Sequence, residues 1–181
     1  MLRWTVELGR IDIHLAVTLL SSYMMQPREG HLIKVLRIFS YLKYNANSTM
    51  IFDHLPVNWE EEAFPKHDWS TFYADAKEEL PPNMPEARGN PVQINCFTDA
   101  DHAGNRITRR SHTGIIIFVN RAPVIWYSKE QNTIESSTFG SEFVATRIAI
   151  ELVIALHYKL CMFGVPVEEA TNLLWIINLW C

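Results

Sequence analysis

The sequence has few cysteines and none of the spacings that build a disulfide or zinc framework. Cys96, Cys161 and Cys181 are widely separated, odd in number and without a C-x-x-C pair. A structural zinc site needs four grouped ligands, and a disulfide-stapled domain needs paired cysteines. We therefore expect reduced thiols and a cytoplasmic or nuclear protein.

The chain also lacks a signal-peptide core and an uninterrupted apolar run. Its first ten residues, MLRWTVELGR, contain no apolar segment of the kind found in a secretory signal. The longest apolar stretch, residues 143–163, is interrupted by polar side chains that a membrane span avoids. These are Arg147, Glu151, His157 and Lys159. We expect no association with a membrane.

The chain has little net charge, but its charges are unevenly distributed. It is 48% hydrophobic and 12% aromatic, with a formal net charge of −4, which suits a folded domain better than a dedicated nucleic-acid binder. Residues 54–89 hold eight acidic side chains against three basic ones. Residues 99–129 hold five basic side chains against two acidic ones, so this segment is a candidate basic patch.

The periodicity of apolar residues divides the chain into three regions. Residues 1–53 are predicted to be helical, with helices over residues 11–25 and 30–43. Residues 54–91 contain six of the nine prolines and are predicted to be an acidic connector. Residues 92–181 are predicted to form a second domain. The apolar faces expected in the two helices are Ile11, Leu15, Leu19 and Tyr23, and Leu32, Leu36, Phe39 and Leu42.

The region after residue 91 predicts an α/β layer fold. Short runs rich in β-branched residues predict three consecutive antiparallel strands, and a long helical pattern follows and ends at Gly164. A further short strand follows the helix, so that the helix would lie across the sheet. The expected strands are residues 92–98, 114–120, 124–128 and 173–177, and the expected helix runs from about residue 137 to 163.

Two carboxylates are candidates for a metal site. Asp99 follows the first predicted strand, and Glu142 lies at the start of the face of the long helix that must pack on the sheet. A buried glutamate is costly without a partner, which a cation shared with Asp99 would supply. Two alternatives stay open. Asp99 or Asp101 could bond its own backbone in a turn, and Glu142 could simply favour the helix dipole.

Four blocks of sequence carry a family resemblance. The blocks TDADHAGN, RRSHTG, APVIWYSKEQ and SSTFGSEF resemble the ribonuclease H domain of copia-type retrotransposon polyproteins. Upstream, LRWTVELGRIDI, PREGHL and RIFSYLK resemble the end of the same family's reverse transcriptase. The matches keep the family's order and cover most of the chain outside the connector.

The resemblance implies a ribonuclease H-like fold, a mixed sheet with helices on it, preceded by a small helical segment. It implies a site in which carboxylates hold Mg²⁺ and cut the RNA strand of an RNA–DNA hybrid. Asp99 and Glu142 match the family's first aspartate and its glutamate, as catalytic and metal-binding residues. The substrate phosphates would be bound by four cations: Arg106, Arg109, Arg110 and Lys129.

The sequence departs from the family after the long helix. The family's next strand ends in Asp-Asn, whose aspartate is the third ligand, whereas here residues 173–178 read LLWIIN, with Ile176 or a neighbour in its place. The fourth aspartate would lie beyond Cys181. We therefore expect a C-terminally incomplete domain that has lost cleavage. The alternatives are a non-catalytic RNA- or hybrid-binding module, acting with or without the rest of a polyprotein, and a relic reading frame without function.

Overall fold

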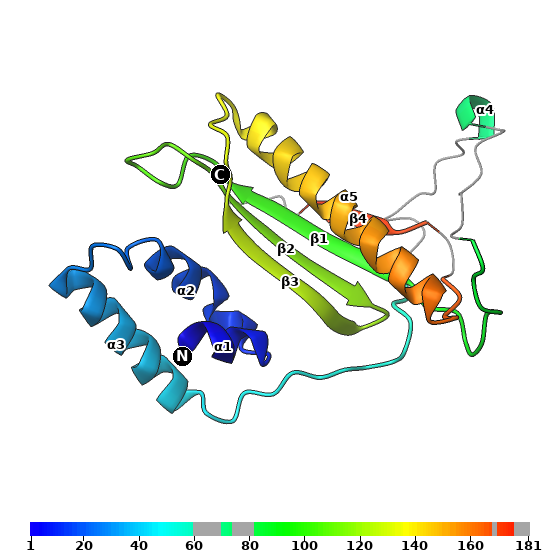
Figure 1. Ribbon diagram of the computed structural model, residues 1–181, viewed down its shortest axis with the longest axis horizontal. Helices are drawn as coiled ribbons and strands as arrows, with labels where there is room; N and C mark the ends of the chain where they lie inside the picture. Colours follow the sequence, from blue (N-terminus) through cyan, green and yellow to red (C-terminus); the bar gives the residue numbers. More distant parts are fainter. Residues whose placement is uncertain (60–69, 74–81, 168–169, 176–181) are drawn as a thin grey trace.

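The structure is a computed structural model that describes residues 1–59, 70–73, 82–167 and 170–175. A four-stranded sheet lies between a group of N-terminal helices and one long helix (Figure 1). The helices are α1 (Leu2–Glu7), the 3-10 turn η1 (Ile11–Ile13), α2 (His14–Ser21), α3 (Glu29–Tyr44), α4 (Ser70–Tyr73) and α5 (Thr138–Met162). The strands are β1 (Ile94–Asp101), β2 (His112–Val119), β3 (Ala122–Glu130) and β4 (Asn172–Trp175).

The sheet is mixed, with the strand order β3-β2-β1-β4. The three consecutive strands pair antiparallel, as predicted, and β4 returns after α5 to pair parallel with β1. Strand β1 is longer than the sequence indicates, because residues 99–101 still pair with His112–Gly114 of β2. Asp99 therefore lies inside β1, and the prediction that it follows the strand is wrong.

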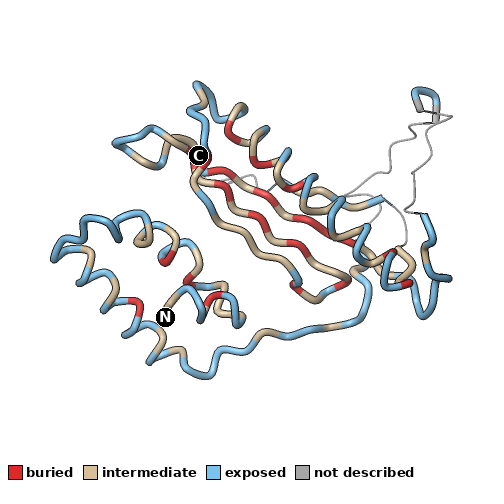
Figure 2. Tube along the Cα trace, viewed as in Figure 1, coloured by how far each residue is buried: buried red, intermediate tan, exposed pale blue. Residues whose placement is uncertain are grey.

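The main core lies between the sheet and α5. Ile94 and Cys96 of β1 and Ile117 of β2 are at most 2% exposed, and they form one cluster with Ala149 of α5 (Figure 2). Ala145 and Ala149 are both fully buried, so the helix backbone can approach β1 closely. The predicted face of this helix is confirmed by the residues packed against the cluster, which include Leu152, Leu156 and Leu160.

The ends of α5 follow the capping signals in the sequence. At the N-terminus, the Ser137 hydroxyl accepts a hydrogen bond from the Gly140 amide at 3.1 Å. At the C-terminus, Gly164 has φ +73°, and its amide donates to the Cys161 carbonyl at 2.9 Å. Both predicted boundaries are confirmed to within one residue.

The N-terminal helices contact the opposite face of the sheet through Trp126 of β3. Trp126 packs against a second cluster, which contains Ile13, Val17 and Ile38. The apolar face predicted for α3 is wrong, since Leu36 is 55% exposed and Ile38 is buried instead. The buried side of α3 is the one that meets α2 and Trp126 of β3, and Ile38 lies on that side. The helix predicted over residues 11–25 is shorter, and α1 was not predicted.

The described part of the connector contacts the sheet. The Trp59 ring nitrogen donates to Asn95 at 3.1 Å, and the Asn172 amide of β4 donates to the same oxygen at 3.0 Å. Asn120, in the β2–β3 turn, donates to the His54 carbonyl at 2.7 Å. Residues 53–59 therefore run along the sheet, and most of the remaining connector lies outside the described residues.

Helix α5 has a second apolar stripe that faces away from the sheet. Phe139 and Phe143 stack with their ring centroids 6.4 Å apart and are 70% and 63% exposed. Ile150 and Ile154 continue the stripe at 45% and 49% exposure. In the described part of the chain, no helix combines the length and apolarity that crossing a membrane requires.

The close packing of α5 on β1 is open to a direct test. Ala149→Leu should overpack the buried interface and lower the free energy of unfolding by about 1–3 kcal/mol. Ala155→Leu, on an exposed position of the same helix, is the matched control and should change it by less than about 0.5 kcal/mol. Urea denaturation of both variants measures the difference, and equal stability would contradict the packing described here.

Candidate functional site: a carboxylate pair beside two clefts

The carboxylates of Asp99 and Glu142 lie near one another at the end of the sheet. Asp99 is the third residue from the end of β1 and pairs with Gly114 of β2. Glu142 lies in the second turn of α5, and its Oε1 accepts a hydrogen bond from the Ala100 amide at 3.3 Å. Because Ala100 follows Asp99 directly, this bond holds the glutamate beside the aspartate.

The environment of Glu142 disfavours its negative charge. Burial raises the pKa of the Glu142 carboxyl above its ordinary value, and the neighbouring Asp99 carboxylate raises the pKa further, against the opposing hydrogen bond from Ala100. Its Oε2 is buried, and the described residues provide no hydrogen-bond partner for it. A proton or a cation at this oxygen would remove the free-energy cost of burying it without a partner.

Gln131 fixes the start of α5 against the sheet. Its side-chain amide donates to the Ser141 carbonyl at 2.9 Å and to the Thr113 hydroxyl at 3.0 Å. Gln131 is 3% exposed and follows β3 directly, so one side chain joins β2, β3 and the residue before Glu142. In the sequence, Gln131 stands out only as the last residue of the block APVIWYSKEQ, and nothing there indicates this positioning role.

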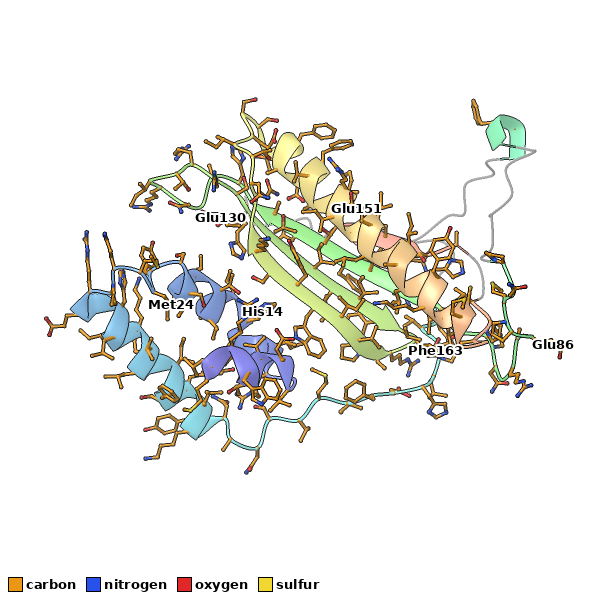
Figure 3. The ribbon with its side chains drawn as sticks, viewed as in Figure 1. His14, Met24, Glu86, Glu130, Glu151 and Phe163 are labelled. Atoms are coloured by element: carbon orange, nitrogen blue, oxygen red, sulfur yellow. The ribbon has the colours of Figure 1, made fainter. Side chains whose placement is uncertain are left out.

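The loop between β1 and β2 is held in a fixed shape by Asn105. The Asn105 side-chain oxygen accepts from the Ile107 and Thr108 amides at 3.0 and 3.1 Å. Its side-chain nitrogen donates to Glu130 at 2.7 Å, and the Thr108 hydroxyl donates to the same carboxylate at 3.2 Å. Figure 3 shows Glu130 at the end of β3, where it anchors this loop.

Gly104 lies close to the side chain of Asp101 where the loop leaves β1. A Cβ atom at this position would collide with the carboxylate of Asp101. Asp101 is exposed and is the last residue of β1, so its carboxylate packs against the loop backbone. The side chain of Asp101 therefore lies against the loop at Gly104.

The four predicted phosphate-binding cations do not form one group. Arg106 and Arg110 line a cleft of about 660 Å³ between the loop and helices α2 and α3, which we call the basic cleft. Arg109 is exposed and has φ +59°. Lys129 lies on the edge strand β3 and lines a smaller cleft of about 250 Å³. The basic cleft also contains Lys34 and Arg37, two cations of α3.

A second cleft, of about 540 Å³, contains Asp99 and is called the Asp99 cleft. It lies between α2 and the face of the sheet opposite α5, and His14 and His112 line it together with Asp99. Figure 3 shows His14 on the helical side of this cleft. Burial lowers the pKa of both histidines, and the His112 ring nitrogen Nε2 lies 2.8 Å from the Ser128 hydroxyl. The Asp99 cleft and the basic cleft share Asp101 and His112.

The chemistry of the carboxylate pair fits one divalent cation. Mg²⁺ prefers carboxylate oxygens and keeps several waters, so Asp99 and Glu142 could hold one ion. Within the described ranges, no group of three or more His, Cys, Asp or Glu side chains converges as a metal site. In β4, Trp175 pairs with Thr98, and the next residue in the sequence, Ile176, lies outside the described residues.

Comparison with known proteins identifies related sequences. The Retrovirus-related Pol polyprotein from transposon RE1 of Arabidopsis thaliana is 25% identical over 134 residues, which is 74% of this chain. That from transposon RE2 is 22% identical over the same length. The chain is related to retrotransposon polyproteins. The resemblance to retrotransposon polyproteins is thereby confirmed.

The chain corresponds to a small part of these polyproteins. It spans 7% of the length of each relative. No protein-family model matches the chain. No solved structure matches it either, so the fold rests on the elements and register described above.

The raised pKa of Glu142 predicts an unusual pH dependence of stability. The folded state holds this proton more tightly than the unfolded chain, so stability is lost as pH rises from about 4.5 through the folded pKa. Glu142→Gln should remove this loss and give a higher melting temperature than the wild type at pH 7 in EDTA. The gain should shrink to nothing below about pH 4.5.

The control for this prediction is Glu151→Gln on the same helix. Glu151 is exposed and pairs with Arg147 at 3.2 Å, so its replacement should destabilise the chain slightly, by about 0.5 kcal/mol or less. Thermal melts of the three proteins between pH 4 and 8 make the comparison. A Glu142→Gln protein that melts below the wild type at pH 7 would refute the unfavourable charge at this position.

Proposed function

We propose that this chain is a ribonuclease H-like part of a retrotransposon polyprotein that binds RNA–DNA hybrids without cleaving them. The observation that carries the proposal is the electrostatic proximity of Asp99 and Glu142, in which the charge of Asp99 raises the pKa of the Glu142 carboxyl. Glu142 bonds the Ala100 amide and keeps a buried oxygen without a partner among the described residues. A mixed sheet with α5 across it is consistent with such a fold.

Asp99 and Glu142 would hold a Mg²⁺ ion in this proposal. A bound ion would supply positive charge for a water nucleophile and the phosphate being attacked. The protein's own contribution is to hold both carboxylates on rigid elements, β1 and α5, with Gln131 fixing the start of α5. The basic side chains around the loop would bind the phosphates of the hybrid.

The proposed loss of cleavage follows from the ligand count. Two-metal displacement needs carboxylates for both ions, and β4 contributes Asn172–Trp175, without a carboxylate, beside β1. The following residues in the sequence, 176–178, are also uncharged. Asp99 and Glu142 alone would hold one ion weakly.

Cleavage by the purified chain should be undetectable. In Mg²⁺ or Mn²⁺, it should cut the RNA of an RNA–DNA hybrid no faster than buffer, because removing members of a catalytic set costs orders of magnitude. Replacing residues 171–181 with a family tail that carries the third and fourth aspartates should restore cleavage. Gel analysis of a labelled hybrid measures both.

The repaired protein supplies the controls for this test. Asp99→Asn and Glu142→Gln should each abolish the restored cleavage, whereas Glu151→Gln should leave it unchanged. Metal-dependent cleavage by the unrepaired chain that is lost on Asp99→Asn would contradict the proposed inactivity. Failure of the repaired protein to cut, with its fold intact, would count against the assignment of Asp99 and Glu142.

Hybrid binding should be electrostatic and independent of sequence. Arg109→Gln with Lys129→Gln should weaken it uniformly and reduce the slope of log affinity against log salt by about 1–2, because two phosphate contacts are lost. Fluorescence anisotropy with a labelled hybrid over a salt series is the measurement. Lys43→Gln with Lys159→Gln is the matched control, since both lysines are exposed and line neither cleft. An equal effect in the control would reduce the binding to non-specific attraction.

A further inference from the structure

The basic cleft gathers cations from two parts of the chain that are far apart in sequence. Lys34 and Arg37 come from α3, and Arg106 and Arg110 come from the β1–β2 loop. Lys34 and Arg37 are one helical turn apart, so they lie on the same side of α3. The two pairs of cations therefore face one another across the cleft.

These four cations form none of the ion pairs seen in the described part of the chain. Ion pairs there join Arg10 to Asp12, Arg121 to Asp53, and Arg147 to Glu151. None of the four cations of the basic cleft takes part in one of these pairs. The cleft is thus electropositive in a chain whose net charge is −4.

Two carboxylates also line the cleft, so its four cations outnumber its anions by two. Glu130 accepts hydrogen bonds from Asn105 and Thr108 and so belongs to the support of the loop. Asp101 packs against the loop backbone at Gly104. The acidic groups hold the loop in place, and the basic groups remain available to a ligand.

Apolar and aromatic side chains also line the cleft, beside the polar Thr18, Ser22 and Asn105. Leu19 and Ile107 line it and are 49% and 87% exposed. Tyr23 also lines it, and its ring stacks on that of His31 with centroids 4.2 Å apart. Cations for phosphates beside an exposed, pre-stacked aromatic ring for bases are the combination that single-stranded nucleic acids require.

We propose that the basic cleft binds a single strand of nucleic acid. Lys34, Arg37, Arg106 and Arg110 contact its phosphates, and Tyr23 stacks on a base. The volume of about 660 Å³ is within the range of pockets that enclose small ligands, and it suits a few nucleotides of one strand rather than a duplex. Because the basic cleft shares Asp101 and His112 with the Asp99 cleft, the bound strand would lead toward the carboxylate pair.

This site goes beyond the proposed hybrid binding and does not depend on it. Lys34 and Arg37 lie outside the set of cations assigned to the hybrid, and Arg109 and Lys129 do not line the basic cleft. Replacements at the two pairs therefore separate the two binding modes. A pair whose replacement leaves its own binding mode unchanged identifies which proposal has failed.

The test is the binding of a labelled oligothymidylate of about 12 nucleotides to the full chain, followed by anisotropy over a salt series. Lys34→Gln with Arg37→Gln should weaken binding about tenfold and reduce the salt slope by about 0.7 for each lost phosphate contact. Tyr23→Leu keeps the wall apolar and should weaken binding about fivefold or more without changing the slope. Circular dichroism confirms that each variant is folded.

Two comparisons make the result decisive. Lys43→Gln with Lys159→Gln removes the same charge from positions outside the cleft and should leave affinity close to that of the wild type. The duplex of the same sequence and heparin should compete less well than the single strand, because neither presents an unstacked base to Tyr23. An equal loss of affinity in the Lys34/Arg37 and Lys43/Lys159 double variants would overturn the proposal. So would an unchanged affinity of Tyr23→Leu together with equal competition by heparin.

Discussion

The close approach of α5 to β1 is the constraint on which the rest of this structure depends. Ala145 and Ala149 leave no side chain thick enough to separate the helix from the strand. Only at this distance can the second turn of α5 bring Glu142 to the Ala100 amide. Gln131 holds the same end of the helix from the other direction, through Ser141 and Thr113. The position of the carboxylate pair is therefore a result of core packing.

The same packing sets two electrostatic environments next to one another. Glu142 is held beside Asp99, where burial and like charge both oppose its ionisation. On the other side of Asp101, the loop presents Arg106 and Arg110 to a cleft that α3 completes with its own cations. The acidic end of β1 therefore contributes to a carboxylate site, and the basic loop that follows it lines a cleft that could bind anions. Glu130 holds this loop through its hydrogen bond from Asn105.

The sequence was most informative where a local signal and the burial pattern agree. The Ser137 cap, Gly164 and the β-branched run of β2 predicted their elements to within about two residues. The extension of β1 to Asp101 was missed because it depends on pairing with residues 112–114, a tertiary effect. For α3, periodicity identified a helix but selected the wrong face, since Ile38 is buried only by contact with α2 and Trp126.

The site was predicted less evenly than the fold. Asp99 and Glu142 stand out in the sequence because a carboxylate beside an apolar pattern is unusual. The grouping of Arg106 and Arg110 with Lys34 and Arg37 is not visible there, since about 70 residues, including the connector and β1, separate the two pairs in the chain. Gln131 has no signal of its own, because a buried amide and an exposed one look alike in a sequence.

The outer stripe of α5 has a thermodynamic consequence. A helix that is apolar on two sides resembles the middle layer of a thicker domain, yet here Phe139, Phe143, Ile150 and Ile154 face solvent in the described structure. Burying side chains of this size typically contributes about 1.5–3 kcal/mol each, and a domain of ordinary stability has only about 5–15 kcal/mol in total. With this stripe in water, the isolated chain lacks a stabilising contribution comparable to the free energy of unfolding of an ordinary domain. Its stability, and so its lifetime in solution, should depend on how much of that stripe is covered.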